Sequence, residues 1–210
     1  MPRYDPSEKT KSEIIQTAVR FVSEKEWDSV RVEDIVKEIG VTRGAFYHYF
    51  KSREELISAV TDYIYLKRNP FTLALKQEGL NALDKFRFAL IANIRFSLEN
   101  SDFANAVVMS MSSPAVFRSE FFSQINTTTP SVEHLLIEGN KDGSISVSHP
   151  KQAAQVLIML YSVWINPAIF RVPYQEFCEK LSFAEYFCEK IGVPVVNNEI
   201  KDLLIQLYKS

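Results

Sequence analysis

Apolar residues recur at intervals of three and four along most of this chain, and such spacing places them on one face of an α-helix. Ile14, Ala18 and Phe21 begin the pattern, which continues almost to the C-terminus. The alternation of apolar and polar residues that is typical of strands occurs only briefly, at 144–148, where the flanking turn residues indicate an extended connector. The sequence therefore predicts an all-α protein.

Capping and turn residues divide this helical pattern into elements. Ser7 and Thr42 are suited to begin helices, because their hydroxyl oxygens accept hydrogen bonds from free backbone N–H groups. Gly40 is suited to end one, and Asn69 with Pro70 indicates a bend between packed helices. The expected helices span residues 7–24, 32–39, 43–50, 52–67, 80–99, 103–111, 114–125, 130–138, 150–166, 174–191 and 198–208.

We expect these helices to form three parts. Residues 1–51 are predicted to be a three-helix N-terminal domain, residues 52–68 a connecting helix, and residues 69–210 a larger helical domain. No linker rich in Ser or Gly separates the parts, so we expect them to meet at a bend rather than at a flexible tether.

The composition excludes several classes of protein. The 210 residues are 46% hydrophobic and 24% charged, which is typical of soluble globular proteins. Polar residues interrupt the apolar stretch 153–170, which falls short of the roughly 20 apolar residues that a bilayer needs. The polar N-terminus has no secretion signal, so we expect a cytoplasmic protein without a membrane partner. Cys178 and Cys188 lie about 15 Å apart on one predicted helix, so we expect free thiols.

Two of the predicted helices, 32–39 and 43–50, are joined by only a few residues around Gly40. This spacing is that of a helix-turn-helix, in which the second helix enters the major groove of DNA. The same arrangement also occurs in helical bundles that never bind nucleic acid. Between Gly40 and Arg53 the chain carries three cations and no acid, so its local charge favours a nucleic-acid partner.

The side chains of the second of these helices favour DNA binding over a purely structural role. Phe46 and Phe50 lie one turn apart and are predicted to face inward. The remaining polar, small and aromatic residues are predicted to form an outer face without an acid to pair its cations. The candidate DNA-binding residues on and beside this face are Thr42, Arg43, Gly44, Ala45, Tyr47, His48, Tyr49, Lys51 and Arg53.

Each type of residue on this face has a defined chemistry toward DNA. Arg43 can donate two hydrogen bonds to a guanine edge, and Tyr47 can donate its hydroxyl to a phosphate. Gly44 lets the helix backbone approach closely, and Ala45 can touch a thymine methyl. Thr42 adds a hydroxyl beside the free N–H groups of the helix N-terminus, which favour phosphate.

The stretch 32–56 resembles the DNA-binding signature of TetR-like (tetracycline-repressor-like) transcriptional regulators. Gly-Val at 40–41, Phe-Tyr-His-Tyr-Phe at 46–50 and Lys-Ser-Arg-Glu-Glu-Leu at 51–56 fall in the register of that family. The resemblance covers roughly residues 9–65. It implies a homodimer whose two recognition helices bind a palindromic double-stranded DNA operator, and a C-terminal ligand-binding and dimerisation domain. It also implies release from the operator when a small-molecule effector binds.

Two positions depart from the family pattern. Arg31 stands where the family usually has Ser or Thr as the cap of the first helix of the motif, which places a cation near phosphate instead. Ala45 stands where Ser or Thr is common, which removes one hydroxyl from the recognition surface. Both departures bear on which operator sequence is recognised.

In the larger domain, aromatic and sulfur-containing side chains gather on the predicted helices. Core packing accounts for any one of them, but as a group they are compatible with an apolar pocket for a small apolar or aromatic effector. Helices 150–166 and 174–191 are the predicted dimer surface, with full burial inside one subunit as the alternative. The candidate ligand-binding residues are Phe86, Phe96, Phe103, Met109, His134, Tyr161 and Trp164.

Catalysis is poorly supported by this sequence. His48, His134 and His149 are not at metal-ligand spacing, and neither a Gly-rich phosphate loop nor a Gly-x-Ser-x-Gly motif occurs. Cys178 and Cys188 have no nearby His to activate a thiol. We therefore expect no enzyme, no metal and no cofactor. The alternative to a ligand-responsive repressor is a helical interaction scaffold that has lost operator binding.

Overall fold

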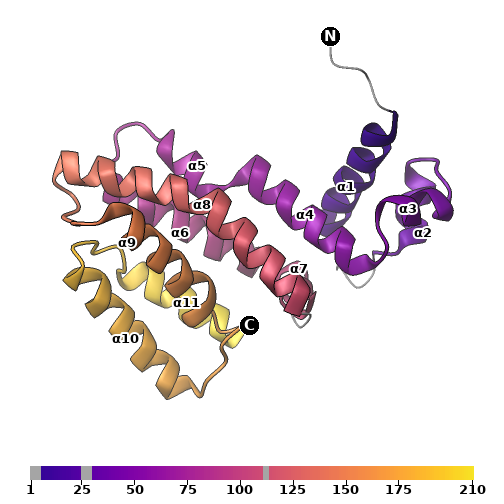
Figure 1. Cartoon of the computed structure of the whole chain (residues 1–210). Helices are drawn as coiled ribbons and strands as arrows, with labels where there is room; N and C mark the ends of the chain where they lie inside the picture. The colour runs from indigo at the N-terminus through magenta and orange to yellow at the C-terminus, as the bar shows by residue number, and fades with distance from the viewer. Residues whose placement is uncertain (1–5, 25–29, 111–113) are drawn as a thin grey trace, which may run out of the picture. The chain divides into compact units, whose positions relative to one another are not determined.

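The computed structural model describes the backbone of residues 6–24, 30–110 and 114–210, and every regular element within these ranges is helical (Figure 1). The all-α fold class is therefore confirmed. The chain forms two compact units, of which the first comprises residues 1–67 and 100–120 and the second residues 68–99 and 121–210. None of the described helices is long and apolar enough to cross a bilayer.

The first unit is built on a small helical core. It contains α1 (Pro6–Glu24), α2 (Val32–Glu38), α3 (Arg43–Tyr49), most of α4 (Arg53–Arg68), α7 (Ser101–Ser110) and the start of α8. Helix α1 packs on α2, and α2 packs on α3. The apolar faces of these helices supply the buried residues Ile14, Ala18, Phe21, Ile35, Val36, Phe46, Leu56, Ile57 and Val60, and Val30 and Phe50 are buried just outside the helix ends.

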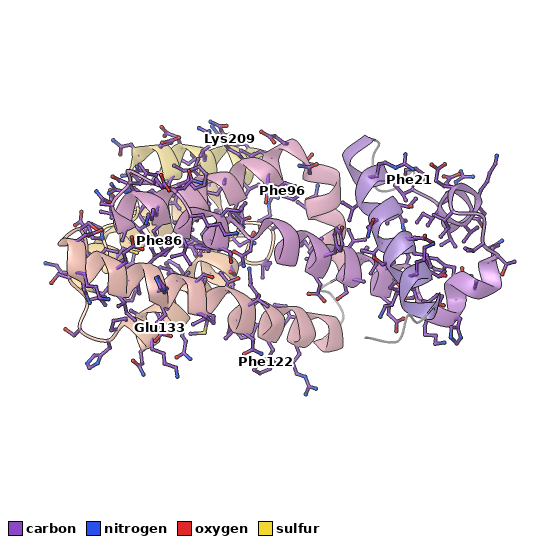
Figure 2. The ribbon with its side chains drawn as sticks, turned by 90° about the horizontal axis from the view of Figure 1, so that it is seen from above. Phe21, Phe86, Phe96, Phe122, Glu133 and Lys209 are labelled. Atoms are coloured by element: carbon purple, nitrogen blue, oxygen red, sulfur yellow. The ribbon has the colours of Figure 1, made fainter. Side chains whose placement is uncertain are left out.

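The second unit is larger and surrounds a single hydrophobic core. It contains α5 (Pro70–Leu75), α6 (Ala82–Glu99), most of α8 (Pro114–Asp142), α9 (Pro150–Met159), a π-helical turn (Leu160–Trp164), α10 (Tyr174–Lys190) and α11 (Asn198–Lys209). Helix α6 packs against both α5 and α11. Phe86 of α6 lies inside this unit (Figure 2). Its ring meets that of Phe71 of α5 edge to face, at 5.8 Å between ring centroids.

Helix α5 was not expected from the sequence. Asn69 caps it, because its side-chain oxygen accepts from the backbone N–H groups of Phe71 and Thr72 at 3.0 and 3.3 Å. Pro70 occupies the first helical position, where its missing N–H would have had no partner in any case. The Asn-Pro pair is therefore a helix start as well as a bend.

Helix α8 corrects a second expectation. Two helices were predicted at 114–125 and 130–138, but the structure has one helix through Pro130. Proline in a helix removes the hydrogen bond to the carbonyl four residues earlier, here that of Asn126. Asn126 and Pro130 are both exposed, so water can satisfy this carbonyl and the helix continues.

The predicted extended connector 144–148 is confirmed, and its position is fixed by hydrogen bonds. The backbone N–H of Ser146 donates to the carbonyl of Gly192 at 2.8 Å. The Asn140 side chain accepts from the N–H of Val147 and donates to its carbonyl, at 2.8 and 2.9 Å. A side chain at Gly192 would collide with the Ser146 backbone, and Gly192 has a φ of 80°, so only glycine fits there.

Candidate nucleic-acid interface

The turn between α2 and α3 is a well-formed helix end followed by a capped helix start. Gly40 adopts a φ of 71°, and the N–H of Val41 donates to the carbonyl of Val36 at 2.9 Å, as in a Schellman ending. Thr42 then caps α3, because its hydroxyl oxygen accepts from the N–H of Ala45 at 3.1 Å. These bonds hold α2 and α3 at the spacing that a helix-turn-helix requires.

The inner face of α3 is fixed by two buried rings. Phe46 is 0% and Phe50 2% exposed, and their ring centroids lie 5.6 Å apart. Phe46 also meets the Tyr47 ring edge to face at 5.3 Å. Burial of these rings sets the rotation of the helix about its axis, so it decides which side chains reach solvent.

The opposite face of α3 is exposed, as the sequence predicted. The side chains of Arg43, Tyr47 and His48 are exposed, and so is the backbone at Gly44. The His48 ring lies 5.0 Å from that of Tyr49, edge to face. Thr42 and Lys51 are exposed as well, whereas Ala45, Tyr49 and Arg53 are partly buried. The structure thus brings most of the predicted DNA-binding residues onto one surface.

Arg43 is not an unpaired cation, and this corrects the expectation from the sequence. Its guanidinium lies 3.0 Å from the carboxylate of Glu33 on α2. Both side chains are more than half exposed, at 61% and 51%. An ion pair in water contributes only about 0–1 kcal/mol, so Arg43 can exchange this partner for a guanine edge or a phosphate.

Lys51 has a structural role that its sequence position did not reveal. Its Nζ donates to the carbonyls of Tyr47 and His48 at 3.2 and 3.4 Å. These carbonyls end α3, where a cation is favourable for the helix dipole. Lys51 therefore stabilises the recognition helix while keeping its charge on the exposed surface.

Two further exposed cations lie beside the helix-turn-helix on other parts of this unit. Lys11 of α1 places its Nζ 5.8 Å from the centre of the Phe50 ring. Arg31 is exposed beside the start of α2. A guanidinium has no atom that accepts a hydrogen bond, so the Arg31 side chain cannot cap the helix. The backbone N–H of Arg31 instead donates to the carboxylate of Asp34 at 3.4 Å. Lys11 was missed by sequence reasoning because it lies far from the motif along the chain and meets it only in the folded unit.

The structure does not bring the candidate ligand-binding residues together at one described site. Phe86 is buried in the core, His134 is exposed, and Phe96, Tyr161 and Trp164 are partly buried. Phe103 and Met109 belong to α7, and their side chains lie outside the described residues. Trp164 makes specific contacts, with the ring of Phe183 at 5.8 Å and with the ammonium of Lys180 at 4.7 Å.

The apolar stripe that was expected to form the dimer surface is largely internal. Leu157 of α9 and Phe177, Leu181, Ala184 and Cys188 of α10 are buried in the core of the second unit. Other apolar side chains in this region are exposed and remain available to a partner: Val156, Met159, Phe170, Tyr174, Phe183 and Tyr186. Helical spacing identified the apolar side of α10 but could not show which side faces its own subunit.

The helix-turn-helix lies within a stretch of the chain that matches a family of known proteins. Residues 14–60 match the family described as bacterial regulatory proteins, tetR family. An uncharacterised HTH-type transcriptional regulator of Bacillus subtilis, YuxN, is 34% identical over 90 residues, which cover 43% of this chain and 31% of YuxN. The match thus spans less than a third of that relative.

Two longer similarities extend over the second unit. IcaR of Staphylococcus aureus, a negative regulator of the biofilm operon icaADBC, is 24% identical over 169 residues, covering 76% of this chain and 84% of IcaR. The crystal structure of RolR with resorcinol aligns over 94% of both chains with a TM-score of 0.62 and 19% identity. Because RolR is only 19% identical to this chain, its structural similarity supports the fold alone.

Proposed function

We propose that this chain is a TetR-family, sequence-specific repressor of transcription, which binds a palindromic operator as a homodimer and leaves it when a small apolar or aromatic ligand binds. The observation that carries the proposal is the outer face of α3. Arg43, Gly44, Tyr47 and His48 are exposed there, while the buried Phe46 holds the helix from behind. The roles below follow from this arrangement.

In this proposal α3 enters the major groove with its N-terminal end toward the bases. Arg43 reads a guanine, Ala45 contacts a thymine methyl, and Gly44 allows the backbone to approach. Tyr47 donates its hydroxyl to a phosphate, and His48 and Tyr49 contact the DNA backbone or neighbouring bases. Thr42, Lys51, Arg53 and Arg31 place hydroxyl and cationic groups beside phosphates.

In this proposal each of the three parts expected from the sequence has its own role. Residues 1–51 bind DNA, residues 52–68 form the connecting helix, and residues 69–210 bind the ligand and the second subunit. Two such subunits related by a twofold axis recognise an inverted repeat whose half-sites lie about one helical turn apart. IcaR, a negative regulator, supports repression as the outcome of binding. RolR, crystallised with resorcinol, supports an aromatic effector.

One observation favours the alternative, a scaffold without operator binding. Glu33 pairs with Arg43 and reduces the positive charge of the recognition face. The weakness of an exposed ion pair leaves DNA binding the better supported of the two functions, because phosphate and guanine offer Arg43 stronger acceptors.

The proposal is tested by selecting bound duplexes from a random DNA pool at about 150 mM salt, where non-specific phosphate binding is suppressed. The expected result is enrichment of an inverted repeat. Recovery of no motif by a folded, dimeric protein would contradict the proposal and favour the scaffold. An Arg43→Ala variant, carried through the same selection, shows whether an enriched motif depends on the recognition helix.

A further inference from the structure

Lys180 is a lysine of α10 that lies on the buried side of the helix, between Phe177 and Ala184. The residue is only 6% exposed, and its Nζ has no hydrogen-bond partner within the described part of the chain. A lysine ammonium carries three donors and is strongly hydrated in water, so burial without a partner is costly. Such a group calls for an explanation.

Two aromatic rings surround this ammonium. Nζ lies 4.1 Å from the ring centre of Phe170 and 4.7 Å from that of Trp164. The negative faces of the rings attract the cation, but they accept no ordinary hydrogen bond. The rings therefore hold the charge in place and leave its donors unused.

The element that carries Trp164 is unusual. Residues Leu160–Trp164 form a π-helical turn, closed by a bond from the N–H of Ile165 to the carbonyl of Leu160 at 2.9 Å. Single π turns within helices occur frequently at functional sites. Phe170 lies in the segment that follows this turn, and the residue is 48% exposed, so one wall of the aromatic site borders solvent.

Two other lysines of the second unit show what Lys180 lacks. Lys85 is 8% exposed, and its Nζ lies 2.6 Å from the carboxylate of Glu138. Lys201 is paired with Glu185 at 2.9 Å. Burial lowers the pKa of the Lys180 ammonium, and the nearby Glu176 carboxylate, which is exposed, opposes this effect only in part. No carboxylate among the described residues forms an ion pair with Lys180.

We propose that Lys180, Trp164 and Phe170 form the binding site for a small organic acid. Its carboxylate pairs with the Lys180 ammonium as the Glu138 carboxylate pairs with Lys85. The rings favour an acid with an aromatic or apolar body, because they offer it ring faces to pack against. Inorganic phosphate lacks an apolar part and would lose its hydration against the rings without compensation. The inference deepens the proposed function, because it rests on a ligand-responsive regulator and gives the effector a charged group.

Trp164 makes the binding of an acid directly observable. The chain has two tryptophans, Trp27 and Trp164, so in a Trp27→Phe variant the fluorescence reports on Trp164 alone. Benzoate, phenylacetate and hexanoate are titrated into this full-length variant at pH 7 and constant ionic strength. Benzamide serves as the uncharged control for benzoate. We expect a saturable change in emission for at least one acid below about 10 mM, with benzamide at least about tenfold weaker than benzoate if benzoate binds.

The second arm replaces the ammonium. Lys180→Met keeps an unbranched side chain of similar length, and we expect it to weaken acid binding at least about tenfold. It should not lower the thermal midpoint, because it removes a buried charge that has no acid partner. Lys190→Met is the matched control, since Lys190 lies on the same helix and is exposed. It should change acid binding by less than about twofold.

Three results of the acid titrations would overturn the inference. These are no saturable response to any of the three acids, equal binding of benzoate and benzamide, or undiminished acid binding by Lys180→Met. Equal competition by sulfate would reduce the site to a general anion site and would also contradict the inference. The outcome is separable from that of the DNA selection, because acid binding is measured without DNA and operator binding without acid.

Discussion

Arg43 and Glu33 decide how much positive charge the recognition face of α3 presents to DNA. If Arg43 reads a guanine, Arg43→Ala should cost about 1–3 kcal/mol on the selected operator and relax base preference at one position in each half-site. Tyr47→Phe should weaken binding to all DNA sequences alike, because the lost hydrogen bond goes to a phosphate. Fluorescence anisotropy on the operator and its single-base variants measures both effects. Equal losses on every sequence for Arg43→Ala would show that this guanidinium does not read a base.

Glu33→Gln should have the opposite effect. It removes the carboxylate that lies 3.0 Å from Arg43, so the guanidinium becomes free to bind DNA. We expect tighter operator binding, with a gain that is larger at low salt because the pair is exposed. Glu38→Gln is the control, since Glu38 is also on the surface of this unit but pairs with Arg20 at 2.6 Å. Equal gains from the two variants would mean that bulk charge, and not release of Arg43, is responsible.

Cys188 should make the stability of the fold sensitive to alkaline pH. Burial raises the pKa of its thiol to about 12, whereas an unfolded thiol has a pKa of about 8.5. Between these values the folded state keeps a proton that the unfolded state releases, so stability falls as pH rises above about 9. Urea unfolding of Cys188→Ala should give lower stability at pH 7 but a flatter decline up to pH 10 than the parent. Cys178→Ala is the control at a partly exposed cysteine.

At the scale of the helix-turn-helix, two glycines should separate stability from DNA binding. Gly40 has a φ of 71°, so Gly40→Ala strains the end of α2 and should lower stability by about 1 kcal/mol or more. At Gly44 the added Cβ would meet only the Thr42 hydroxyl, at 3.7 Å. Gly44→Ala should therefore stabilise α3 by up to about 1 kcal/mol while weakening operator binding, because the methyl group holds the backbone away from DNA. Thermal unfolding and anisotropy measurements on both variants test this separation.

The helices themselves were largely predictable from the sequence, and the two failures have a common cause. Both occurred at prolines, which were interpreted as breaks. Pro70 instead begins α5 behind the Asn69 cap, and Pro130 is carried inside α8 with its lost bond facing solvent. Proline removes one hydrogen bond wherever it stands, but the surroundings decide whether that loss ends a helix.

At the level of the whole molecule, we expect the exposed side of α10 to hold the proposed homodimer together. Phe183 and Tyr186 are 53% and 56% exposed there, although large apolar side chains are usually covered in a stable assembly. We expect the double variant Phe183→Ser, Tyr186→Ser to sediment as a monomer at concentrations where the parent is a dimer. Phe88→Ser removes a ring that is 40% exposed on α6 and should leave the dimer intact. Dissociation by both variants alike would place the interface elsewhere.

The sequence by itself determined the all-α class, the helix-turn-helix and the outer face of α3. All three depend on local information, namely the spacing of apolar residues, the caps at Thr42 and Gly40, and the residue types between them. Only the tertiary structure decided that Glu33 neutralises Arg43, that Lys11 joins Phe50, and that the apolar stripe of α10 is internal. It also decided that the Lys180 ammonium lies against the rings of Trp164 and Phe170, with no carboxylate paired to it among the described residues. Each of these depends on which helix packs against which, and the spacing of residues within one helix does not encode the identity of its neighbour.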